Sequence, residues 1–402
     1  MKITDLPEIF LQAMPILKKI QQAGFEAYFV GGCVRDLLLD KKPHDVDIAT
    51  SAYPAEIKQI FKRTIDTGIK HGTVTVLQQK QAYEVTTFRT ESGYQDFRRP
   101  DHVTFVRSLS YDLQRRDLTI NALAMDLNGQ VIDLFDGVRD LQKGIIRAVG
   151  VPHERFHEDA LRMMRTVRFA SQLSFVIEQQ TLKAIAENAA LLKHIAVERI
   201  HEEWQKLLLG SYPQNGLRPL VVTELYRYCP GFNGQVAVLQ KMISLPRLKF
   251  NSVAGGWCLF GYLAQFTTGE MTELLRTWKS SNDLIKSVIV AMQATKLLEN
   301  SSLGEWQMYS LGWKAIQIAC ENVTLLGKKN PMIEMQQKYQ KLPINNIKEL
   351  AINGGTLITE LNLTPGPQVG QLLADLEKAV VIGHLSNVKE DLLQQARIII
   401  KK

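Results

Sequence analysis

Residues 31–50 read GGCVRDLLLDKKPHDVDIAT, and this stretch decides the fold class of the chain. It joins a glycine pair to two aspartates, Asp45 and Asp47, that a single valine separates. In a strand, residues two apart point to the same face, so HDVDIAT (44–50) predicts a strand that presents both carboxylates together and turns Val46 into the core. Neighbouring carboxylates repel each other unless a cation lies between them. The stretch therefore predicts a cation site downstream of a glycine turn.

The chemistry that suits this pattern is phosphoryl transfer. Paired acids are hard oxygen ligands for Mg²⁺, which prefers a few carboxylates completed by water and substrate phosphates. Two metal ions ~3.5–4 Å apart would stabilise the attacking and leaving oxygens of an in-line displacement. Gly32 lets the backbone approach a triphosphate, and Arg35 adds a guanidinium fork. We expect the aspartate pair to be catalytic and to bind metal, with Glu84 in AYEVTTF as a third catalytic acid from a later strand.

Two alternatives to this interpretation involve no chemistry. The tripeptide DVD could be an exposed strand edge with solvated acids, and Glu84 could be an ordinary surface glutamate. The glycine pair and Arg35 beside the aspartates favour the catalytic interpretation for the pair, whereas Glu84 rests on the strand pattern alone.

Composition places the chain among globular proteins and excludes several classes. The 402 residues are 45% hydrophobic and 22% charged, and the formal net charge is +7. That charge is compatible with a polyanionic partner but is weak evidence alone. No apolar run reaches the ~18 residues of a membrane span, and the N-terminus lacks the apolar core of a signal peptide. The four cysteines are far apart without a CxxC pair, which argues against a disulfide framework or a zinc site and favours a reducing cytoplasm.

The pattern along the chain predicts an α+β fold in which strands are confined to the first part. Strand signals occur up to about residue 148, including a pair of strands over 73–89 and a hairpin over 121–137. Residues 91–102 are polar and lack apolar anchors, so we expect a mobile loop there. After about residue 150 the periodicity is helical. We expect four parts, a head (1–148), a neck (149–212), a helical body (213–340) and a helical tail (341–402).

GGCVRDLLL and DVDIAT resemble the signature of the polymerase β-type nucleotidyltransferases, in the branch that holds class II tRNA CCA-adding enzymes and bacterial poly(A) polymerases. Four further motifs continue the resemblance in order, and together they cover about the first 210 residues: RRDLTINALA (115–124), IDLFDGVRDLQKGIIR (132–147), EDALRMMRTVRF (158–169) and ERIHEEWQKLL (198–208). The resemblance implies a head with a small mixed sheet and helices, followed by an elongated all-α neck, body and tail.

The arginines of these motifs are the candidate nucleotide ligands. The resemblance implies that Arg116 approaches the nucleotide. It also implies that Asp159 and Arg162 act as a protein template for the base, because an acceptor and a forked donor match the edges of C and A and not those of G and U. Arg165 and Arg168 would meet the triphosphate or orient that pair. Spacing alone also permits a surface helix with i,i+3 salt bridges in this segment, and a solvated basic pair at 115–116.

The motif ERIHEEWQKLL favours a structural role. Its charged residues are spaced four apart in complementary order, so we expect them to brace the neck rather than touch substrate: Glu198, Arg199, Glu202 and Lys206. The eight histidines are scattered, and none is assigned chemistry.

The function implied is template-independent addition and repair of the 3′-terminal CCA of tRNA, with CTP, ATP and Mg²⁺, and release of pyrophosphate. Three enzyme alternatives remain: a poly(A) polymerase, a CC-adding enzyme and an A-adding enzyme. The chain after the arginine helix, ASQLSFVIE, lacks the basic GRRF-type stretch of the polymerases, and the full-length segment 91–114 argues against CC addition. A-only addition stays open, as does a catalytically inactive tRNA-binding module, although both metal carboxylates and Arg35 are present.

The expected partners are the 3′ end of tRNA and the two nucleotides, with no membrane. Basic runs in residues 240–402, including KKNP (328–331) and IIIKK at the end of the printed sequence, would suit contact with an RNA backbone. Ordinary solvated lysines explain these runs equally well. The expected location is the cytoplasm, and the sequence leaves a homodimer open.

Overall fold

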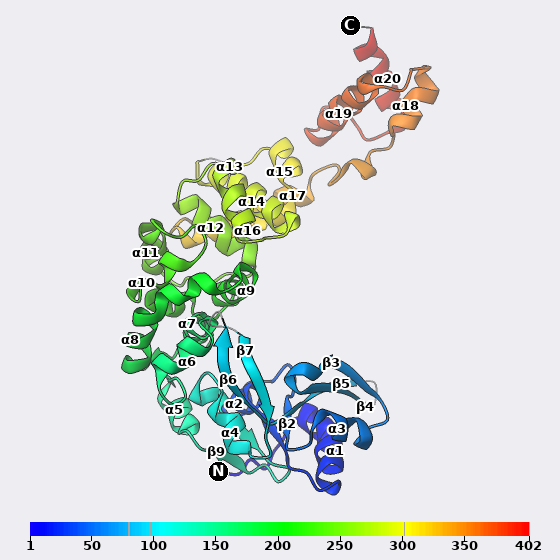
Figure 1. Cartoon of the computed structure of the whole chain (residues 1–402). Coiled ribbons are helices and arrows are strands. Elements are labelled where there is room, and N and C mark those ends of the chain that lie inside the picture. The colour runs from blue at the N-terminus through cyan, green and yellow to red at the C-terminus, as the bar shows by residue number, and fades with distance from the viewer. Residues whose placement is uncertain (79–80, 96–98, 301, 402) are drawn as a thin grey trace. The chain divides into compact units, whose positions relative to one another are not determined.

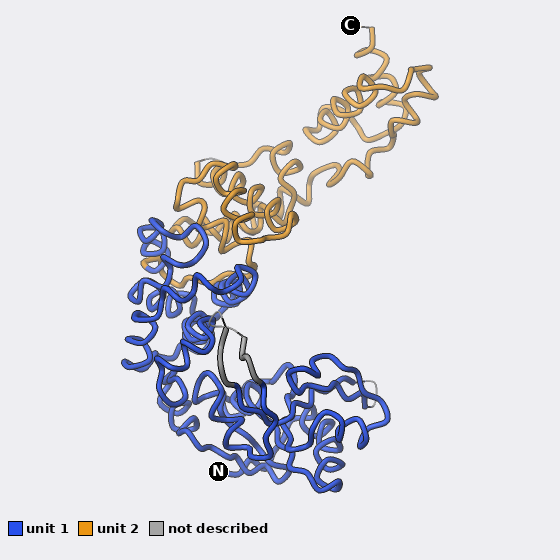
Figure 2. The backbone as a smooth tube through the Cα atoms, in the orientation of Figure 1, with its two compact units in different colours: residues 1–243 blue, residues 244–402 orange. Residues whose placement is uncertain are grey.

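The computed structural model describes the whole chain except residues 79–80, 96–98, 301 and 402. It divides the chain into two compact units, Met1–Ile243 and Ser244–Lys402, which Figure 2 colours separately. The four expected parts are finer than these two units, and their boundaries stay a prediction. In the described part of the chain, no helix combines the length and the apolar character that crossing a membrane requires.

A seven-stranded mixed sheet forms the centre of the first part of the chain, with the strand order β3-β4-β5-β2-β1-β8-β9. Strands β2 and β5 run parallel, and the other neighbouring pairs of this sheet run antiparallel. Its strands are β1 (Ala27–Val30), β2 (Ile48–Thr50), β3 (Thr64–Gly68), β4 (Thr73–Gln78), β5 (Gln81–Thr87), β8 (Leu123–Met125) and β9 (Val131–Asp133). The strands expected over 73–89 and the hairpin expected over 121–137 are confirmed.

Helices cover the two faces of this sheet because alternate residues of β1 point to opposite faces. On one face, Phe10 of α1 packs edge-to-face on Phe29, with ring centroids 5.0 Å apart. On the other face, Val30 packs with Phe88 and Leu113 of α4. Figure 1 shows α1 and α3 beside the strands. The helices of this part are α1 (Glu8–Gln22), α2 (Gly32–Leu38), α3 (Pro54–Ile60), α4 (Leu109–Gln114) and α5 (Gly137–Lys143).

The loop expected over 91–102 is wrong for the residues that the structure describes. Two antiparallel strands, β6 (Arg89–Gln95) and β7 (Arg99–Phe105), form a separate two-stranded sheet there, and residues 96–98 between them lie outside the described part. Strand pairing rests on backbone hydrogen bonds, which polar residues form as readily as apolar ones. The polar composition that predicted a loop is therefore compatible with a hairpin.

The expected change to helical structure after about residue 150 is confirmed. Strands β10 (Ile145–Ile146) and β11 (Val176–Ile177) pair in parallel at the start of this region. Helix α7 is largely buried and packs against α9 and α10. The helices up to the end of the first unit are α6 (Pro152–Glu158), α7 (Leu161–Leu173), α8 (Gln179–Asn188), α9 (Val197–Leu208), α10 (Pro213–Val222) and α11 (Val236–Ser244), the last of which ends at the unit boundary.

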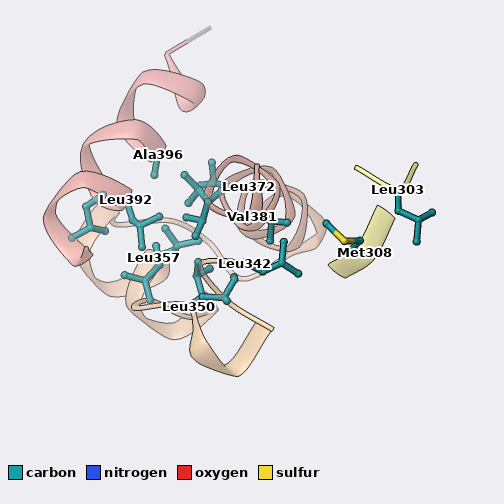
Figure 3. Close-up of a cluster of buried hydrophobic side chains, with 14 of the residues drawn as sticks. Leu303, Met308, Leu342, Leu350, Leu357, Leu372, Val381, Leu392 and Ala396 are labelled. Atoms are coloured by element: carbon teal, nitrogen blue, oxygen red, sulfur yellow. The ribbon is translucent and has the colours of Figure 1, made fainter. Parts of the chain in front are cut away.

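The second unit is helical in its described residues. A cluster of buried aliphatic side chains runs from Leu303 to Ala396 and holds the last helices together (Figure 3). Its helices are α12 (Val253–Leu263), α13 (Thr268–Thr277), α14 (Asn282–Asn300), α15 (Glu305–Leu311), α16 (Trp313–Leu325), α17 (Met332–Gln340), α18 (Gly354–Leu361), α19 (Pro367–Val381) and α20 (Lys389–Ile400). An α+β part followed by a helical part is the fold class that the sequence predicts.

Candidate active site

A cleft of about 590 Å³ lies in the first unit, and nearly all of the predicted site residues line it. Segments far apart in the sequence form its walls: the glycine turn before α2, the aspartate segment before β2, the chain between α4 and β8, the start of α7, and α9. The predicted residues that line it are Gly32, Arg35, Asp45, Asp47, Arg116, Asp159, Arg162, Arg165 and Arg168. Glu84 is the predicted site residue that does not line this cleft.

The glycine turn lets an arginine lie directly against the backbone. Gly31 has φ 74° and ψ −127°, a conformation that side chains rarely tolerate. A Cβ atom at this position would lie 2.7 Å from Nη1 of Arg116. Glycine is therefore required here both for its backbone conformation and for the space that the Arg116 guanidinium occupies.

The two aspartates lie just before β2 and not within it, which corrects the strand predicted over 44–50. Asp45 and Asp47 are exposed and Val46 between them is buried, so the predicted alternation holds although the strand begins only at Ile48. The carbonyl of Asp47 accepts a hydrogen bond from the amide of Val30 at 3.0 Å, which ties the segment to β1. Both carboxylates reach the cleft from one short, anchored segment.

Glu84 lies beside this pair although it does not line the cleft. Ile48 pairs with Val85 in the parallel β2–β5 ladder. Asp47, just before β2, and Glu84, within β5, each come one residue before this pair. Partial desolvation by the surrounding protein is the main cause that raises the pKa of Asp47 to about 6, and the negative charges of Asp45 and Glu84 add to it. The positive charge of Arg116 opposes this shift. The three carboxylates therefore repel one another, and a cation bound between them would relieve this repulsion.

Among the residues that the structure describes, no group of three or more histidine, cysteine, aspartate or glutamate side chains is placed to hold a metal ion. Mg²⁺ is commonly bound by one or two carboxylates and completed by substrate phosphates and water. The aspartate pair fits that second arrangement.

Arg116 is held by a buried carboxylate. Asp112 of α4 is 1% exposed and accepts from Arg115 at 2.7 Å and from Arg116 at 3.1 Å. Burial alone would raise the pKa of Asp112, but the two guanidinium groups outweigh it and hold the pKa below its usual value. Nε of Arg116 is buried and has no hydrogen-bond partner among the residues that the structure describes. It is a donor that a ligand in the cleft could satisfy.

Asp117 connects the head to helix α7. Its Oδ2 accepts from Nε of Arg165 at 2.7 Å, and its Oδ1 accepts from the amide of Leu118 and from the side chain of Asn121. Burial would raise the pKa of Asp117, but the guanidinium groups of Arg165 and Arg162 and the hydrogen bond from Asn121 hold this pKa far below its usual range. Asp117 is therefore an ionised structural link between two walls of the cleft.

Asp159 and Arg162, the predicted base-reading pair, do not lie on one continuous helix. Asp159 lies in the break between α6 and α7, and only the three arginines of the motif are on α7. Asp159 accepts from Nη2 of Arg199 at 3.0 Å. Arg162 donates to Glu158 at 2.6 Å and to the carbonyl of Arg115 at 3.0 Å. The two side chains thus share the cleft, and each is held in place by a different partner.

Three arginine side chains lie around the ring of Phe169. The guanidinium carbons of Arg168, Arg35 and Arg165 lie 4.0, 5.0 and 5.9 Å from its ring centroid. Arg168 also pairs with the buried carboxylate of Glu203 at 2.5 Å. Burial, and the charges of Arg165 and Arg35, lower the pKa of Arg168. Cations crowded in this way favour an anionic ligand between them.

Sequence reasoning missed three residues that line the cleft. Arg199 was expected to brace the neck, but it bonds Asp159, and its Nη1 is buried without a partner among the described residues. Phe169 and Asn121 stood inside quoted motifs without a predicted role. The charge spacing of ERIHEEWQKLL predicted that Arg199 braces the neck and does not touch substrate. Arg199 does pair within the expected neck, with Asp159, and Lys206 pairs with Glu202 at 3.9 Å, but Arg199 also lines the cleft.

Three family models match successive parts of the chain. Residues 27–147 match the poly A polymerase head domain, residues 174–235 match the probable RNA- and SrmB-binding site of polymerase A, and residues 248–396 match the putative domain 2 of tRNA nucleotidyltransferase. The first match contains the sheet, both aspartates and Arg116. The third covers most of the second unit, for which the sequence alone offered no motif.

Similar whole proteins extend these matches over the full length. The chain is 54% identical to the CCA-adding enzyme of Lactiplantibacillus plantarum, over 99% of this chain and 98% of that protein. It is 53% identical to the CCA-adding enzyme of Limosilactobacillus reuteri, over the whole of both. Among solved structures, the Bacillus stearothermophilus CCA-adding enzyme in complex with CTP superposes with a TM-score of 0.87 at 37% identity, covering 98% of each chain.

Proposed function

The chain belongs to the family of CCA-adding enzymes, and on this basis we propose that it adds and repairs the 3′-terminal CCA of tRNA, using CTP and ATP and releasing pyrophosphate. The observation that supports this most directly is the cleft itself. It places two carboxylates at one wall and a set of arginines at the others, within one compact unit. A nucleoside triphosphate needs both, because its phosphates require cations and its reacting phosphorus requires a metal-binding acid pair.

We propose that Asp45 and Asp47 hold the metal, assisted by Glu84. Nucleotidyltransferases of this family use a divalent metal ion, and oxygen ligands without histidine or cysteine favour Mg²⁺. When bound, Mg²⁺ would lower the charge repulsion at the α-phosphate as the 3′ hydroxyl of the RNA attacks it. The chain's own contribution is to hold the two carboxylates on a segment anchored to β1, so that the ligands are in place before substrate arrives.

We propose that the arginines bind the triphosphate. Arg35, Arg165 and Arg168 converge on Phe169 and would contact phosphate oxygens, with Arg116 next to Gly31. The buried acids Asp112, Asp117 and Glu203 hold the guanidinium groups of Arg116, Arg165 and Arg168, respectively, in position. Binding would then cost little side-chain ordering.

We propose that Asp159 and Arg162 select the base. A carboxylate accepts from the amino group of cytosine or adenine, and a guanidinium donates to their ring acceptors, whereas G and U place donors where Arg162 also donates. Arg199 holds Asp159, and Glu158 holds Arg162. Because these partners hold Asp159 and Arg162 in place, the distance between the two base-reading side chains would stay the same when different nucleotides bind.

The expected tail (341–402) is our proposal for tRNA contact, and the cytoplasm is our proposal for the location, since the relatives are bacterial enzymes and tRNA is the substrate. A homodimer is compatible with the sequence, and light scattering of the purified chain would measure it.

Sequencing of the product tests the proposed function. The protein is incubated with Mg²⁺ and a tRNA that ends at the discriminator base, together with CTP and ATP, and the added nucleotides are read. Addition of C, C and A in that order is expected. A product with only A added, only two C added, or a run of A would assign the chain to one of the three alternative activities. No extension, with tRNA binding retained, would indicate an inactive binding module.

A further inference from the structure

One amide side chain, that of Asn121, joins two walls of the cleft. Asn121 is 6% exposed and lies at the end of a 3₁₀ turn, η2 (Thr119–Asn121). Its Oδ1 accepts from Nη1 of Arg35 on α2 at 2.6 Å, and its Nδ2 donates to Oδ1 of Asp117 at 3.3 Å. Asp117 in turn accepts from Arg165 on α7 at 2.7 Å. The chain of contacts therefore runs from Arg35 on α2 to Arg165 on α7 through the side chains of Asn121 and Asp117.

Only a neutral group with one donor and one acceptor fits this position. Arg35 has donors alone, and the ionised carboxylate of Asp117 has acceptors alone. The two neighbours fix the orientation of the amide, with its oxygen toward Arg35 and its nitrogen toward Asp117. A carboxylate in its place would repel Asp117, and an apolar side chain would leave both charged partners without this contact.

The backbone of the same residue serves a third arginine. The carbonyl of Asn121 accepts from Nη1 of Arg116 at 3.4 Å, and this is the guanidinium that packs against Gly31. Asn121 thus contacts Arg35 and Arg116 directly and reaches Arg165 through Asp117.

We infer that Asn121 is a positioning residue that sets the spacing between Arg35 and Arg165, so that both walls of the cleft contact the phosphates of one nucleotide. The inference rests on the proposed function, because it assumes a nucleoside triphosphate in the cleft. It predicts that Asn121 affects all nucleotides alike through the phosphates they share and leaves the choice of base to other residues.

The test compares Asn121→Leu and Asn121→Asp with the wild-type protein and with Asn128→Asp. Asn128 is an exposed turn residue of the same domain and has no place in the cleft. Equilibrium binding of CTP, ATP, UTP and cytidine is measured, together with kcat and KM for CTP and for tRNA. Loss of a hydrogen bond to a charged group predicts that Asn121→Leu binds each triphosphate about tenfold or more weakly. Cytidine binding, the CTP-to-UTP preference and the KM for tRNA should stay as in the wild type.

The isosteric variant supplies a readout that a merely structural role would not move. In Asn121→Asp the introduced carboxyl lies between Asp117, whose like charge raises its pKa, and Arg35, whose opposite charge lowers it. Lowering the pH from about 8 to about 4.5 protonates a growing fraction of this carboxyl. The protonated acid can donate to Asp117 and accept from Arg35, as the amide does. CTP affinity relative to wild type at the same pH should therefore recover on acidification. The charged groups around this position are Arg35 and Asp36 from α2, Arg116 and Asp117 from the chain before η2, Arg165 from α7, and Asp140 from α5, which faces Thr119.

The outcomes separate the two levels of the proposal. A wild-type protein that binds no CTP would refute the proposed function. A wild-type protein that binds CTP while both variants bind it equally well would overturn the role of Asn121. Equal weakening of cytidine and CTP would also overturn it, since that result indicates general damage to the cleft. If Asn121→Leu fails to fold, Asn121→Asp decides: recovery of affinity at low pH supports the inference, and a constant deficit at every pH overturns it.

Discussion

The substitution Gly31→Ala tests whether the position of Arg116 against the glycine turn matters for catalysis. Gly31 has φ 74°, and a Cβ atom there would lie 2.7 Å from Nη1 of Arg116. The natural control is Gly24→Ala, because Gly24 has φ 89° and a Cβ atom added there would have nothing within 4 Å. Both substitutions force a side chain into a backbone conformation with positive φ, whereas only Gly31→Ala also meets the cleft arginine.

The two costs can be separated by magnitude. Each variant should lose about 1–3 kcal/mol of unfolding free energy through backbone strain. The clash adds a further loss in Gly31→Ala alone, because Arg116 must turn away from the added Cβ atom. Turning away breaks its 3.1 Å contact with Asp112 and removes its guanidinium from the nucleotide. A lost hydrogen bond from a charged group is worth about 1.5–3 kcal/mol, or about tenfold to 150-fold in kcat/KM.

The assay is urea unfolding of both variants, followed by single-nucleotide addition of C under conditions where both are folded. We expect Gly31→Ala to lose more unfolding free energy than Gly24→Ala, by up to about 1.5–3 kcal/mol for the broken Asp112 contact. The kcat/KM for CTP should drop in Gly31→Ala alone. If Gly31→Ala matched Gly24→Ala within about twofold in kcat/KM, the glycine would serve only the backbone, and the position of Arg116 against it would not matter for catalysis.

Three further results are expected. Asp47→Ala should abolish nucleotide transfer while tRNA binding persists, and a loss of less than about tenfold in rate would be too small for a metal ligand. Asp159→Ala and Arg162→Ala should erode the preference for CTP and ATP over UTP and GTP by about tenfold to a hundredfold, measured as kcat/KM for each nucleotide; uniform loss with unchanged preference would return both residues to a structural role. The pKa of Asp112 is lower in the folded state than in the unfolded state, so its ion pairs stabilise the fold fully above about pH 4 and are lost as the pH falls through the folded-state pKa. In urea unfolding at decreasing pH, the unfolding free energy of the wild type should therefore fall more steeply than that of Asp112→Asn.

Features encoded within a short stretch of chain could be predicted from sequence. The glycine turn, Arg35 and the aspartate pair lie within one twenty-residue segment. Their residue types specify a turn, a cation and a pair of acids, which we propose binds metal, almost without context. The hairpin at 121–137 and the helical region after residue 150 follow from periodicity, which is also local. The family resemblance added the arginines of α7, because their motif is a fixed sequence pattern.

Only the tertiary structure decided which partner holds each of these residues. Arg165 pairs with Asp117 across 48 residues of sequence, and Asp159 pairs with Arg199 across 40. Periodicity reports which face of an element is buried and does not report what lies opposite that face. Sequence reasoning therefore gave Arg199 only a bracing role in the neck and gave Asn121 no role. The folding of α2, α7 and α9 around one cleft brings the partners of both residues within hydrogen-bond distance.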